Sequence, residues 1–468
     1  MECRAQRPPG ARASRLGDAL LTLAQLVRRD KVSLYAHARR IAEMHLPHSR
    51  TLASRLTEAR AASDALFDVV KPEFLYERPI RERHRIVFYI GHLEAFDRNL
   101  FDKRLFDLPS SDARLDRLFA FGIDPVDGQL PTDTPADWPA LAAVHAYGRD
   151  ARSRIDDQLS ALDLPVDASN HDTPGQLLNV AIEHRLMHVE TLAYMLHQLP
   201  FEQKRAPGAA RPRSDHRYDV EHEMVQVPAG RTELGMTAER GVFGWDNEFG
   251  EQQVDVPAFE IDRFMVTNGV FLAFIEDGGY RRRDLWNDAD WAWKESAQVE
   301  HPVFWSRGPE GWQLRTMFED IPLPRAWPAY VSHAEASAFA RWRGAKLPSE
   351  AQWQRAAHGA LPGYTDNFDF RSWDPVAVDA TPDSVSTWGV EGLYGNGWEW
   401  TSTLFGPLPG FKAFPFYEGY SANFFDGQHY TMKGGSPRTA QCMVRPTFRN
   451  WFQPHYQYVY AGFRCVRD

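Results

Sequence analysis

The sequence predicts an α+β multidomain protein, in which a helical bundle precedes a mixed α/β domain rich in loops. Between residues 13 and 199 apolar residues recur three and four positions apart in long runs, which is typical of amphipathic helices. After Pro200 this period stops, and short apolar segments alternate with turns. Tryptophan use changes at the same place, because 14 of the 15 tryptophans lie beyond residue 200.

Length and composition indicate a globular protein with a small-molecule partner. A chain of 468 residues is too long for one ordinary core and favours two or three domains. Hydrophobic residues make up 43% and charged residues 25%, as in ordinary globular proteins. No apolar run approaches the roughly 20 residues that span a bilayer. The net charge of -10 is modest for this length, so we expect no nucleic-acid or membrane partner. The oligomeric state stays open.

The N-terminus and the cysteines favour a cytoplasmic protein. Residues 1–14 are rich in Arg, Pro and Ala and lack the apolar segment of a signal peptide, so we predict a disordered leader. An organelle-targeting segment is the alternative interpretation. Cys3, Cys442 and Cys465 are odd in number and far apart, which gives no disulfide framework and fits a reducing compartment.

The bundle is expected over residues 15–203. Helical spacing predicts helices over 15–46, 50–70, 81–105, 136–162 and 174–199. The segment between the third and fourth of these, residues 106–138, contains Pro, Asp and Gly and is long for a connection. Segments of that length often line a site.

Three histidines of the bundle form a candidate metal site. His184 and His188 are four residues apart, so on a helix over 174–199 both lie on one face, one turn apart. His92, in another predicted helix, is a candidate third ligand, and Gly91 beside it allows close packing. Three imidazoles would leave coordination positions open for a substrate and oxygen and suit iron, zinc or copper. The alternative is three ordinary core or surface histidines.

The second domain, predicted over 218–468 after a linker at 204–217, carries a family resemblance. Seven short blocks occur in one order: VPAG at 227–230, FGWDNE at 243–248, VTN at 266–268, KLPSEAQW at 346–353, GNGWEWT at 395–401, GGS at 434–436 and AGFR at 461–464. This order resembles the formylglycine-generating-enzyme-like (sulfatase-modifying factor) domain, whose fold is C-type-lectin-like. The resemblance covers nearly all of residues 221–468.

A bundle with a histidine trio ahead of such a domain resembles the ergothioneine-type sulfoxide synthases, which fuse a DinB-like bundle to it. The resemblance implies a non-haem Fe(II) enzyme that uses O2 to join a sulfur donor to the imidazole of hercynine, which is trimethylhistidine. It also implies that His92, His184 and His188 are the Fe(II) ligands. Glu190 completes the family's His-x-x-x-His-x-Glu motif but lies off the ligand face of the helix, so we expect a carboxylate behind the ligands or on the surface.

The resemblance extends to residues that would hold hercynine. Tyr417 and Tyr420 are similar to two family tyrosines, of which the first supplies a proton or hydrogen atom and the second helps to hold hercynine. Asn450 and Trp451 resemble an Asn-Trp pair that contacts hercynine. A trimethylammonium cation suits aromatic faces, so Trp451 is a candidate contact, as are Trp398 and Trp400. Simple packing in the core is the alternative for these aromatic residues.

The donor half of the site departs from the family pattern. In the branch that uses γ-glutamylcysteine an Asp follows the Asn-Trp pair, whereas this chain has Phe452. A family Gln before the last histidine ligand is Met187 here, and residues 106–124 lack the Arg-rich, Pro-rich pattern of that branch. These departures favour the related selenoneine synthases, which join a neutral seleno-sugar to C2 of hercynine. A sulfoxide synthase using γ-glutamylcysteine or cysteine is the alternative.

Two interpretations from other classes remain. A true formylglycine-generating enzyme is a copper and cysteine oxidase with two nearby cysteines, and here Cys442 and Cys465 are 23 residues apart. A ligand-binding module without chemistry is the other, because a fold does not fix a function. Such a module has no reason to keep a metal trio.

Overall fold

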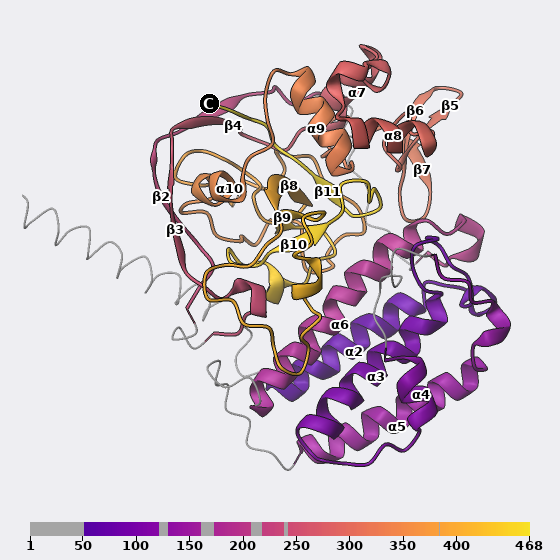
Figure 1. Ribbon diagram of the computed structural model, residues 1–468. Coiled ribbons are helices and arrows are strands. Elements are labelled where there is room, and N and C mark those ends of the chain that lie inside the picture. Colours follow the sequence, from indigo (N-terminus) through magenta and orange to yellow (C-terminus); the bar gives the residue numbers. More distant parts are fainter. Residues whose placement is uncertain (1–50, 121–129, 161–172, 207–217, 238–241, 383) are drawn as a thin grey trace, which may run out of the picture. The chain divides into compact units, whose positions relative to one another are not determined.

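The computed structural model describes residues 51–120, 130–160, 173–206, 218–237, 242–382 and 384–468. By its internal contacts the chain forms two compact units, Met1–Ser54 and Arg55–Asp468, and the second contains both the helical region and the region of strands (Figure 1). The predicted leader 1–14, the predicted helix 15–46 and most of the predicted linker 204–217 lie outside the described residues. The predicted domain boundaries therefore stay predictions.

The helical region follows the predicted helices closely. It contains α2 (Leu52–Phe67), α3 (Ile86–Arg104), α4 (Ala113–Leu118), α5 (Leu141–Leu159) and α6 (Pro174–His197), with short 3-10 turns at Pro72–Phe74, Pro135–Asp137 and Phe201–Gln203. The fourth predicted helix begins later than expected, at Leu141, because Pro139 stands just before it.

Helix α6 is the element on which the candidate site depends. The Thr173 hydroxyl accepts a hydrogen bond from the Gln176 backbone N–H, and Pro174 occupies the first turn, both of which favour a helix start. All of its residues are buried except Pro174, Leu186, Met187 and Thr191. A helix buried on every side is packed between other layers, and α6 contacts α3 of the bundle as well as residues of the C-terminal region.

The segment 106–138 contains a helix that its sequence did not predict. In α4 the Asp112 side chain caps the first turn by accepting hydrogen bonds from the backbone N–H groups of Arg114 and Leu115. The helix packs on α3, and the Phe119 ring at its end lies against Gly91, where a Cβ atom would stand 2.5 Å from the ring. Gly91 therefore permits this close contact between the two helices.

Within its described residues, the C-terminal region holds four small sheets. Their orders are β1 (Met224–Val227), β4 (Phe259–Asp262), β12 (Val466–Arg467); β10 (Asn450–Phe452), β9 (Tyr430–Gly435), β8 (Gly397–Leu404), β11 (Ala461–Gly462); β2 (Gly230–Leu234), β3 (Gln252–Val256); and β5 (Trp305–Gly308), β6 (Gly311–Arg315), β7 (Asp320–Pro322). Helices α7 (Asn268–Glu276), α8 (Asp288–Ser296), α9 (His333–Trp342) and α10 (Glu350–Ala356) accompany them. The predicted fold class, a helical bundle plus a loop-rich α/β domain, is confirmed.

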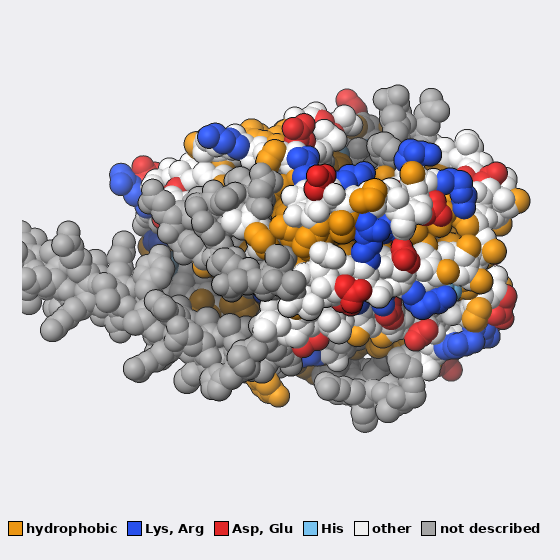
Figure 2. Space-filling view, turned by 90° about the horizontal axis from the view of Figure 1, so that it is seen from below, with side chains coloured by type: hydrophobic (Ala, Val, Ile, Leu, Met, Phe, Trp, Pro, Cys, Tyr) orange, Lys and Arg blue, Asp and Glu red, His pale blue; other side chains and the backbone are white. Residues whose placement is uncertain are grey.

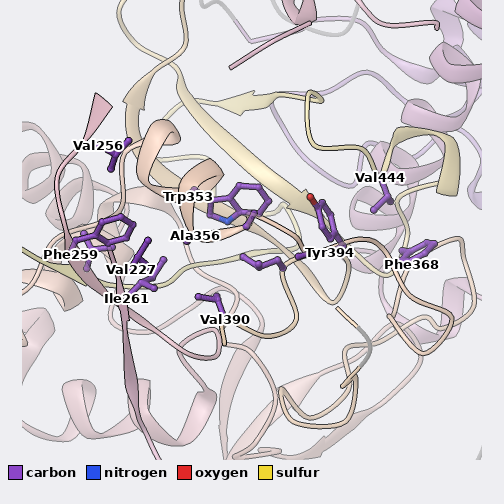
Figure 3. Packing of buried hydrophobic residues seen from close by; sticks show 14 residues of the cluster. Val227, Val256, Phe259, Ile261, Trp353, Ala356, Phe368, Val390, Tyr394 and Val444 are labelled. Atoms are coloured by element: carbon purple, nitrogen blue, oxygen red, sulfur yellow. The ribbon is translucent and has the colours of Figure 1, made fainter. Parts of the chain in front are cut away.

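A buried cluster holds the C-terminal region together around Trp353 of α10 (Figure 3). The side chains of Val227, Phe259 and Ile261, from β1 and β4, form one end of the cluster, and Tyr394 lies between them and Phe368. Trp353 is fully buried, and its indole N–H donates to Glu399 of β8 at 2.9 Å. The cluster thus fixes α10 against the central sheet.

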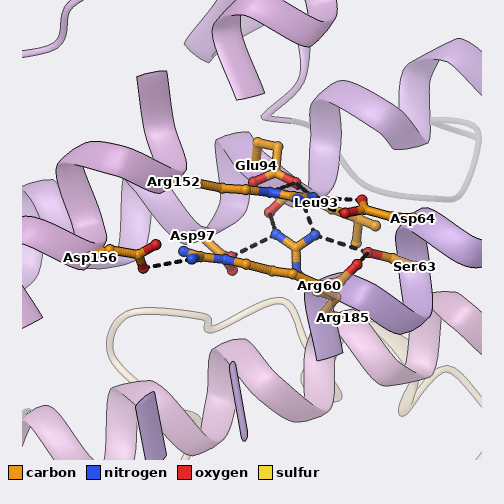
Figure 4. A network of polar contacts seen from close by, with 9 residues as sticks. All are labelled: Arg60, Ser63, Asp64, Leu93, Glu94, Asp97, Arg152, Asp156 and Arg185. Carbon is orange, nitrogen blue, oxygen red and sulfur yellow. Dashed lines mark hydrogen bonds and ion pairs between the residues drawn. The ribbon is translucent and has the colours of Figure 1, made fainter. Parts of the chain in front are cut away.

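A buried charge network ties α6 to α3 inside the bundle (Figure 4). The Arg185 guanidinium donates to Glu94 at 3.0 Å and to Asp97 at 2.7 Å. Arg152 of α5 also donates to Glu94, at 2.7 Å. Burial opposes the charge of Glu94, but the two guanidinium groups outweigh it and lower the pKa of this carboxyl to about 2. Arg185 directly follows His184, so the network fixes the helix position of that histidine.

The surface carries charges of both signs. On the face seen in Figure 2, Lys and Arg side chains are interspersed with Asp and Glu, and hydrophobic side chains lie between them. Among the residues that the structure describes, no helix has the length and apolarity to cross a membrane. The expected absence of nucleic-acid and membrane partners and the cytoplasmic location stay predictions.

Candidate metal centre

The structure brings the three predicted histidines together. His92 of α3 and His184 and His188 of α6 are each at most 3% exposed, and one ring nitrogen of each lies within 4.8 Å of the others. Two nitrogens bonded to one ion at about 2.1 Å and at right angles to each other are about 3 Å apart. The three rings would therefore move closer together around an ion, and their nitrogens are near enough to hold one.

The ring nitrogens are in the state that a metal requires. Neither nitrogen of His184, nor Nδ1 of His188, has a hydrogen-bond partner among the described residues, although buried polar atoms are normally paired. Burial lowers the pKa of both rings well below its usual value, and the neighbouring histidines add to the effect. Neutral, unpaired imidazoles are the form that binds a metal ion.

His92 is oriented by the segment 106–138. Its Nδ1–H donates to the Phe119 carbonyl at 2.7 Å, which leaves Nε2 with its lone pair. Burial lowers the pKa of His92 to about 4 despite this hydrogen bond. The segment 106–138 therefore contacts the candidate site, because helix α4 ends beside Phe119, whose carbonyl holds one candidate ligand.

A wall of aromatic rings, consisting of Phe96, Tyr417, Tyr420 and Trp451, lies beside His184 and is called the aromatic wall below. Phe96 of α3 stacks on the His184 ring, with centroids 3.5 Å apart and planes 12° apart. The Tyr417 ring lies 5.3 Å from Phe96 and 6.1 Å from His184. Tyr417 is thus close to the trio, as expected for a residue that acts on a bound reactant.

Tyr420 links the wall to two other predicted residues. Its ring lies 5.5 Å from Tyr417 and 5.4 Å from Trp451, and its hydroxyl donates to the Met187 sulfur at 3.4 Å. Trp245 stacks on Tyr420 with centroids 4.0 Å apart. Tyr417, Tyr420 and Trp451 of the C-terminal region and Met187 of α6 therefore form one continuous group.

Three predicted residues have other surroundings. The Asn450 amide oxygen accepts a hydrogen bond from the Trp451 backbone N–H at 2.9 Å, so it serves the strand locally. Trp398 and Trp400 are buried, and their indole N–H groups donate to Glu190 and to the Val331 carbonyl. The two tryptophans belong to the core, which was the alternative interpretation.

Phe452 faces a different group from Trp451, its neighbour on β10. The Phe452 ring stacks on Tyr456 with centroids 5.0 Å apart and lies 6.4 Å from Tyr194 of α6. Arg83 stands 6.0 Å from the Phe452 centroid and 4.9 Å from that of Tyr456. Neighbouring strand residues point to opposite sides, so the strand presents two separate aromatic surfaces.

Glu183, directly before His184, joins α6 to the C-terminal region. Its carboxylate accepts hydrogen bonds from Arg445 at 2.8 and 3.0 Å and from the Trp245 indole at 2.8 Å. Arg445 also pairs with Glu248, whose carboxylate accepts the Trp245 backbone N–H at 2.8 Å. Burial opposes the charge of Glu248, but Arg445 outweighs it and lowers the pKa of this carboxyl. The same ion pair therefore holds the helix of His184 and the loop of Trp245.

Glu190, two residues after His188, also connects α6 to the C-terminal region. The hydroxyls of Ser436 and Thr439 and the Trp398 indole all donate to its carboxylate, the last at 2.7 Å. Burial raises the pKa of Glu190 against these donors. This carboxylate was expected either behind the ligands or on the surface. The surface placement is wrong, because the side chain is buried against the C-terminal region.

The two cysteines of the C-terminal region are free thiols that burial keeps protonated. Burial raises the pKa of Cys442 to about 12 and that of Cys465 well above its usual value. A thiol is a poor metal ligand and a poor nucleophile. This does not favour the copper and cysteine chemistry of the alternative interpretation.

Sequence reasoning missed five residues of the centre. Phe96, Phe119, Glu183, Trp245 and Arg445 act on the trio or its wall through the contacts above. Two of them had a sequence signal, because Trp245 lies in the FGWDNE block and Glu183 directly precedes a candidate ligand.

Comparisons with known proteins agree with this architecture. Residues 209–468 match the sulfatase-modifying factor enzyme 1-like domain, and residues 55–192 match the DinB superfamily. The chain is 33% identical over 455 residues to a hercynine oxygenase of Mycolicibacterium thermoresistibile, across 90% of this chain and 96% of that protein. The chain belongs to the hercynine oxygenase family. The predicted order of a DinB-like and a sulfatase-modifying factor domain is thereby confirmed.

Two further proteins are similar to parts of the chain. A hercynine oxygenase of Mycobacterium tuberculosis is 38% identical over 253 residues, which are 50% of this chain and 58% of that protein. Ergothioneine biosynthesis protein 1 of Neurospora crassa is 26% identical across 85% of this chain and 55% of its own length.

Proposed function

We propose that the protein is a non-haem Fe(II), O2-dependent enzyme that joins a selenium or sulfur donor to C2 of the hercynine imidazole. The observation that carries the proposal is the buried trio of His92, His184 and His188, in which His184 and His188 have ring nitrogens without a partner among the described residues, in a member of the hercynine oxygenase family. Three neutral imidazoles on one side of an ion leave positions for reactants, and nitrogen ligands suit Fe(II).

The overall reaction balances with O2 as the oxidant. Hercynine loses the hydrogen on C2 and the donor R–XH loses the hydrogen on X, where X is selenium or sulfur. One oxygen atom leaves with these two hydrogens as water and the other stays on X, so that hercynine–X(O)–R forms. The four electrons that O2 accepts come from formation of the C–X bond and from oxygenation of X. Bound Fe(II) supplies the activation of O2, and the protein positions the reactants.

The aromatic wall is suited to hold hercynine beside the trio. Tyr420 and Trp451 are ring faces 5.4 Å apart in T-shaped contact, and such faces attract a trimethylammonium cation. Asn450, on the same strand, is assigned to the hercynine carboxylate by the family pattern. The Met187 sulfur accepts a hydrogen bond from the Tyr420 hydroxyl and so holds Tyr420 against α6.

Tyr417 is the proposed catalytic residue, because its ring lies 6.1 Å from His184. Its hydroxyl would deliver a proton or hydrogen atom to the reacting oxygen, which favours C–X bond formation over oxidation of the donor alone. A Tyr417→Phe variant should shift the ratio of coupled product to oxidised donor towards oxidised donor. An unchanged ratio would remove Tyr417 from this role.

A seleno-sugar is the favoured donor, which makes the protein a selenoneine synthase. The support is Phe452 in place of the family's Asp, because a phenyl ring cannot pair with the amino group of an amino-acid thiol. Hercynine sulfoxide synthesis from γ-glutamylcysteine or cysteine is the second candidate, and the similarity to hercynine oxygenases favours it.

The test is an assay with Fe(II) added anaerobically, then hercynine, O2 and one donor at a time, with products identified by mass. The donors are a 1-seleno-hexose, γ-glutamylcysteine and cysteine. Product from the seleno-hexose alone supports selenoneine synthesis, and product from a thiol supports the second candidate. No hercynine-derived product from any donor would refute the proposed function, and a protein that binds no Fe(II) would favour a ligand-binding module.

A further inference from the structure

Asp246 is a fully buried carboxylate beside the segment that carries Tyr417 and Tyr420. It is 0% exposed, and its Oδ1 accepts a hydrogen bond from the Ser421 hydroxyl at 2.6 Å. Its Oδ2 is also buried and has no hydrogen-bond partner among the described residues. Buried carboxylates normally have several donors or a cation, so a carboxylate held by one hydroxyl is a candidate for a functional role.

The turn that contains Asp246 interlocks with the tyrosine segment. The Trp245 ring stacks on Tyr420 with centroids 4.0 Å apart, and its centroid lies 6.5 Å from that of Tyr417. Asp246 directly follows Trp245, and Ser421, to which it is bonded, directly follows Tyr420. Two consecutive residues of the turn therefore hold two consecutive residues of the segment, one pair by stacking and the other by a hydrogen bond.

The segment 411–421 contains turns and no helix or strand. The Tyr417 N–H donates to the Phe414 carbonyl at 2.9 Å, and the Tyr420 N–H donates to the Tyr417 carbonyl at 3.1 Å. Side chains on such segments are placed less precisely than those on helices and strands unless other residues hold them. Because a reacting group must be placed precisely, the position of Tyr417 depends on contacts from outside its segment.

The charge of Asp246 changes near neutral pH. Burial raises the pKa of its carboxyl to about 6, although the Ser421 hydroxyl and nearby backbone N–H groups oppose the shift. A carboxylate accepts a stronger hydrogen bond from a hydroxyl than a neutral acid does, so the bond from Ser421 is strongest above this pKa. The titratable or charged side chains that contact this turn are Glu183, Glu248, Tyr417, Tyr420 and, through the two glutamates, Arg445.

We propose that Asp246 is a positioning residue, which holds Tyr417 beside the histidine trio through its hydrogen bond with Ser421. The inference rests on the proposed function, in which Tyr417 acts on the reacting oxygen, and adds the group that keeps this tyrosine in place. The charged carboxylate fixes the end of the segment, while Trp245 fixes the Tyr420 ring. A neutral side chain at position 246 loosens this attachment and lets the Tyr417 hydroxyl move.

The first test measures the ratio of coupled product to oxidised donor, with the donor that gives product in the assay above. Asp246→Asn keeps the shape but removes the charge, and Ser421→Ala removes the hydroxyl. Each should lower the ratio about 10- to 100-fold. In a Tyr417→Phe background, Asp246→Asn should change it less than about twofold, because both act through one hydroxyl. Asp255→Asn, at an exposed ion pair with Arg231, is the matched control and should keep the wild-type ratio.

The second test needs no turnover. The protein is loaded with Zn(II), which three imidazoles also bind, and 3-fluorotyrosine replaces its 16 tyrosines. The fluorine resonance of Tyr417 is the one that Tyr417→Phe lacks. When the pH is lowered through about 6, this resonance should shift in the wild type and in Asp255→Asn. It should stay constant in Asp246→Asn and in Ser421→Ala, because the titrating group or its link to the segment is gone.

The outcomes separate the two proposals. If the wild type makes no hercynine-derived product from any donor, the proposed function fails, and the fluorine spectra decide on the positioning role. If the wild type makes product and both Asp246→Asn and Ser421→Ala keep its ratio, only the positioning role is overturned. It is also overturned if Asp246→Asn lowers the ratio by the same factor with and without Tyr417. A Tyr417 resonance that still shifts in Asp246→Asn would assign the titration to another carboxyl and contradict the proposal.

Discussion

Glu183 offers the sharpest test of how the two regions cooperate. Its carboxylate accepts two hydrogen bonds from Arg445 and one from the Trp245 indole, and Trp245 in turn stacks on Tyr420. Glu183→Gln keeps one oxygen for Trp245 but removes the charge opposite Arg445. We expect hercynine binding to depend on this residue although it touches neither the metal site nor the wall of Tyr420 and Trp451 directly.

The magnitude follows from the contacts. Breaking a buried ion pair by removing one partner costs about 3–5 kcal/mol. Arg445 keeps Glu248 in this variant, so the loss is closer to that of one charge-assisted hydrogen bond, about 1.5–3 kcal/mol. If most of it appears in the placement of Trp245 and Tyr420, the Kd of hercynine rises roughly 10- to 100-fold.

The assay is anaerobic titration of the Fe(II) protein with hercynine, alongside titration of the metal-free protein with Fe(II). Glu183→Gln should weaken hercynine binding by that factor and leave Fe(II) affinity within threefold of the wild type. Glu223→Gln is the matched control, because Glu223 forms an exposed ion pair with Arg263, and exposed pairs contribute little. Equal losses in both affinities, or no loss in either, would refute the reasoning.

Three further predictions concern the metal centre. His184→Ala should abolish stoichiometric Fe(II) binding measured by metal analysis, whereas His145→Ala, at an exposed position of α5, should retain one equivalent. Gly91→Ala should weaken Fe(II) binding about 10- to 100-fold. The added Cβ would displace the Phe119 ring and with it the carbonyl that orients His92. Gly148→Ala is the control and should bind Fe(II) normally, because its Cβ meets a side-chain carbon only at 3.2 Å. Between pH 6.5 and about 4 the unfolded chain binds more protons than the folded chain at His92. The free energy of unfolding of the metal-free protein, measured by denaturant titration, should therefore decrease as the pH is lowered through this range, by up to about 1.4 kcal/mol per pH unit for this residue. A free energy of unfolding that does not change with pH would contradict burial as the cause.

The sequence predicted the elements that carry a strong local pattern. The helix expected over 174–199 is α6, Pro174–His197, because helical apolar spacing and Pro174 both act within the segment itself. His184 and His188 could be paired for the same reason, since their spacing is local. His92 was only a candidate third ligand from its place in another bundle helix, and the family resemblance assigned it, because nothing local brings α3 against α6.

The parts that could not be predicted depend on contacts between distant segments. Glu190 accepts a hydrogen bond from Ser436, which lies 246 residues further along the chain. The helical period alone cannot distinguish a carboxylate in such a contact from an exposed one. Trp398 was assigned to two possible places for the same reason. Helix α4 was missed because six residues are too few for a period, although Asp112 at its start was a capping signal.

The central claim is that the histidine trio and the aromatic wall of the second domain form one site, with hercynine beside the metal. The most direct measurement is the electron paramagnetic resonance spectrum of the anaerobic Fe(II) protein treated with nitric oxide, recorded with and without hercynine. We predict a high-spin signal that is lost in His184→Ala and that one equivalent of hercynine reshapes in the wild type. A spectrum that saturating hercynine leaves unchanged would contradict the claim.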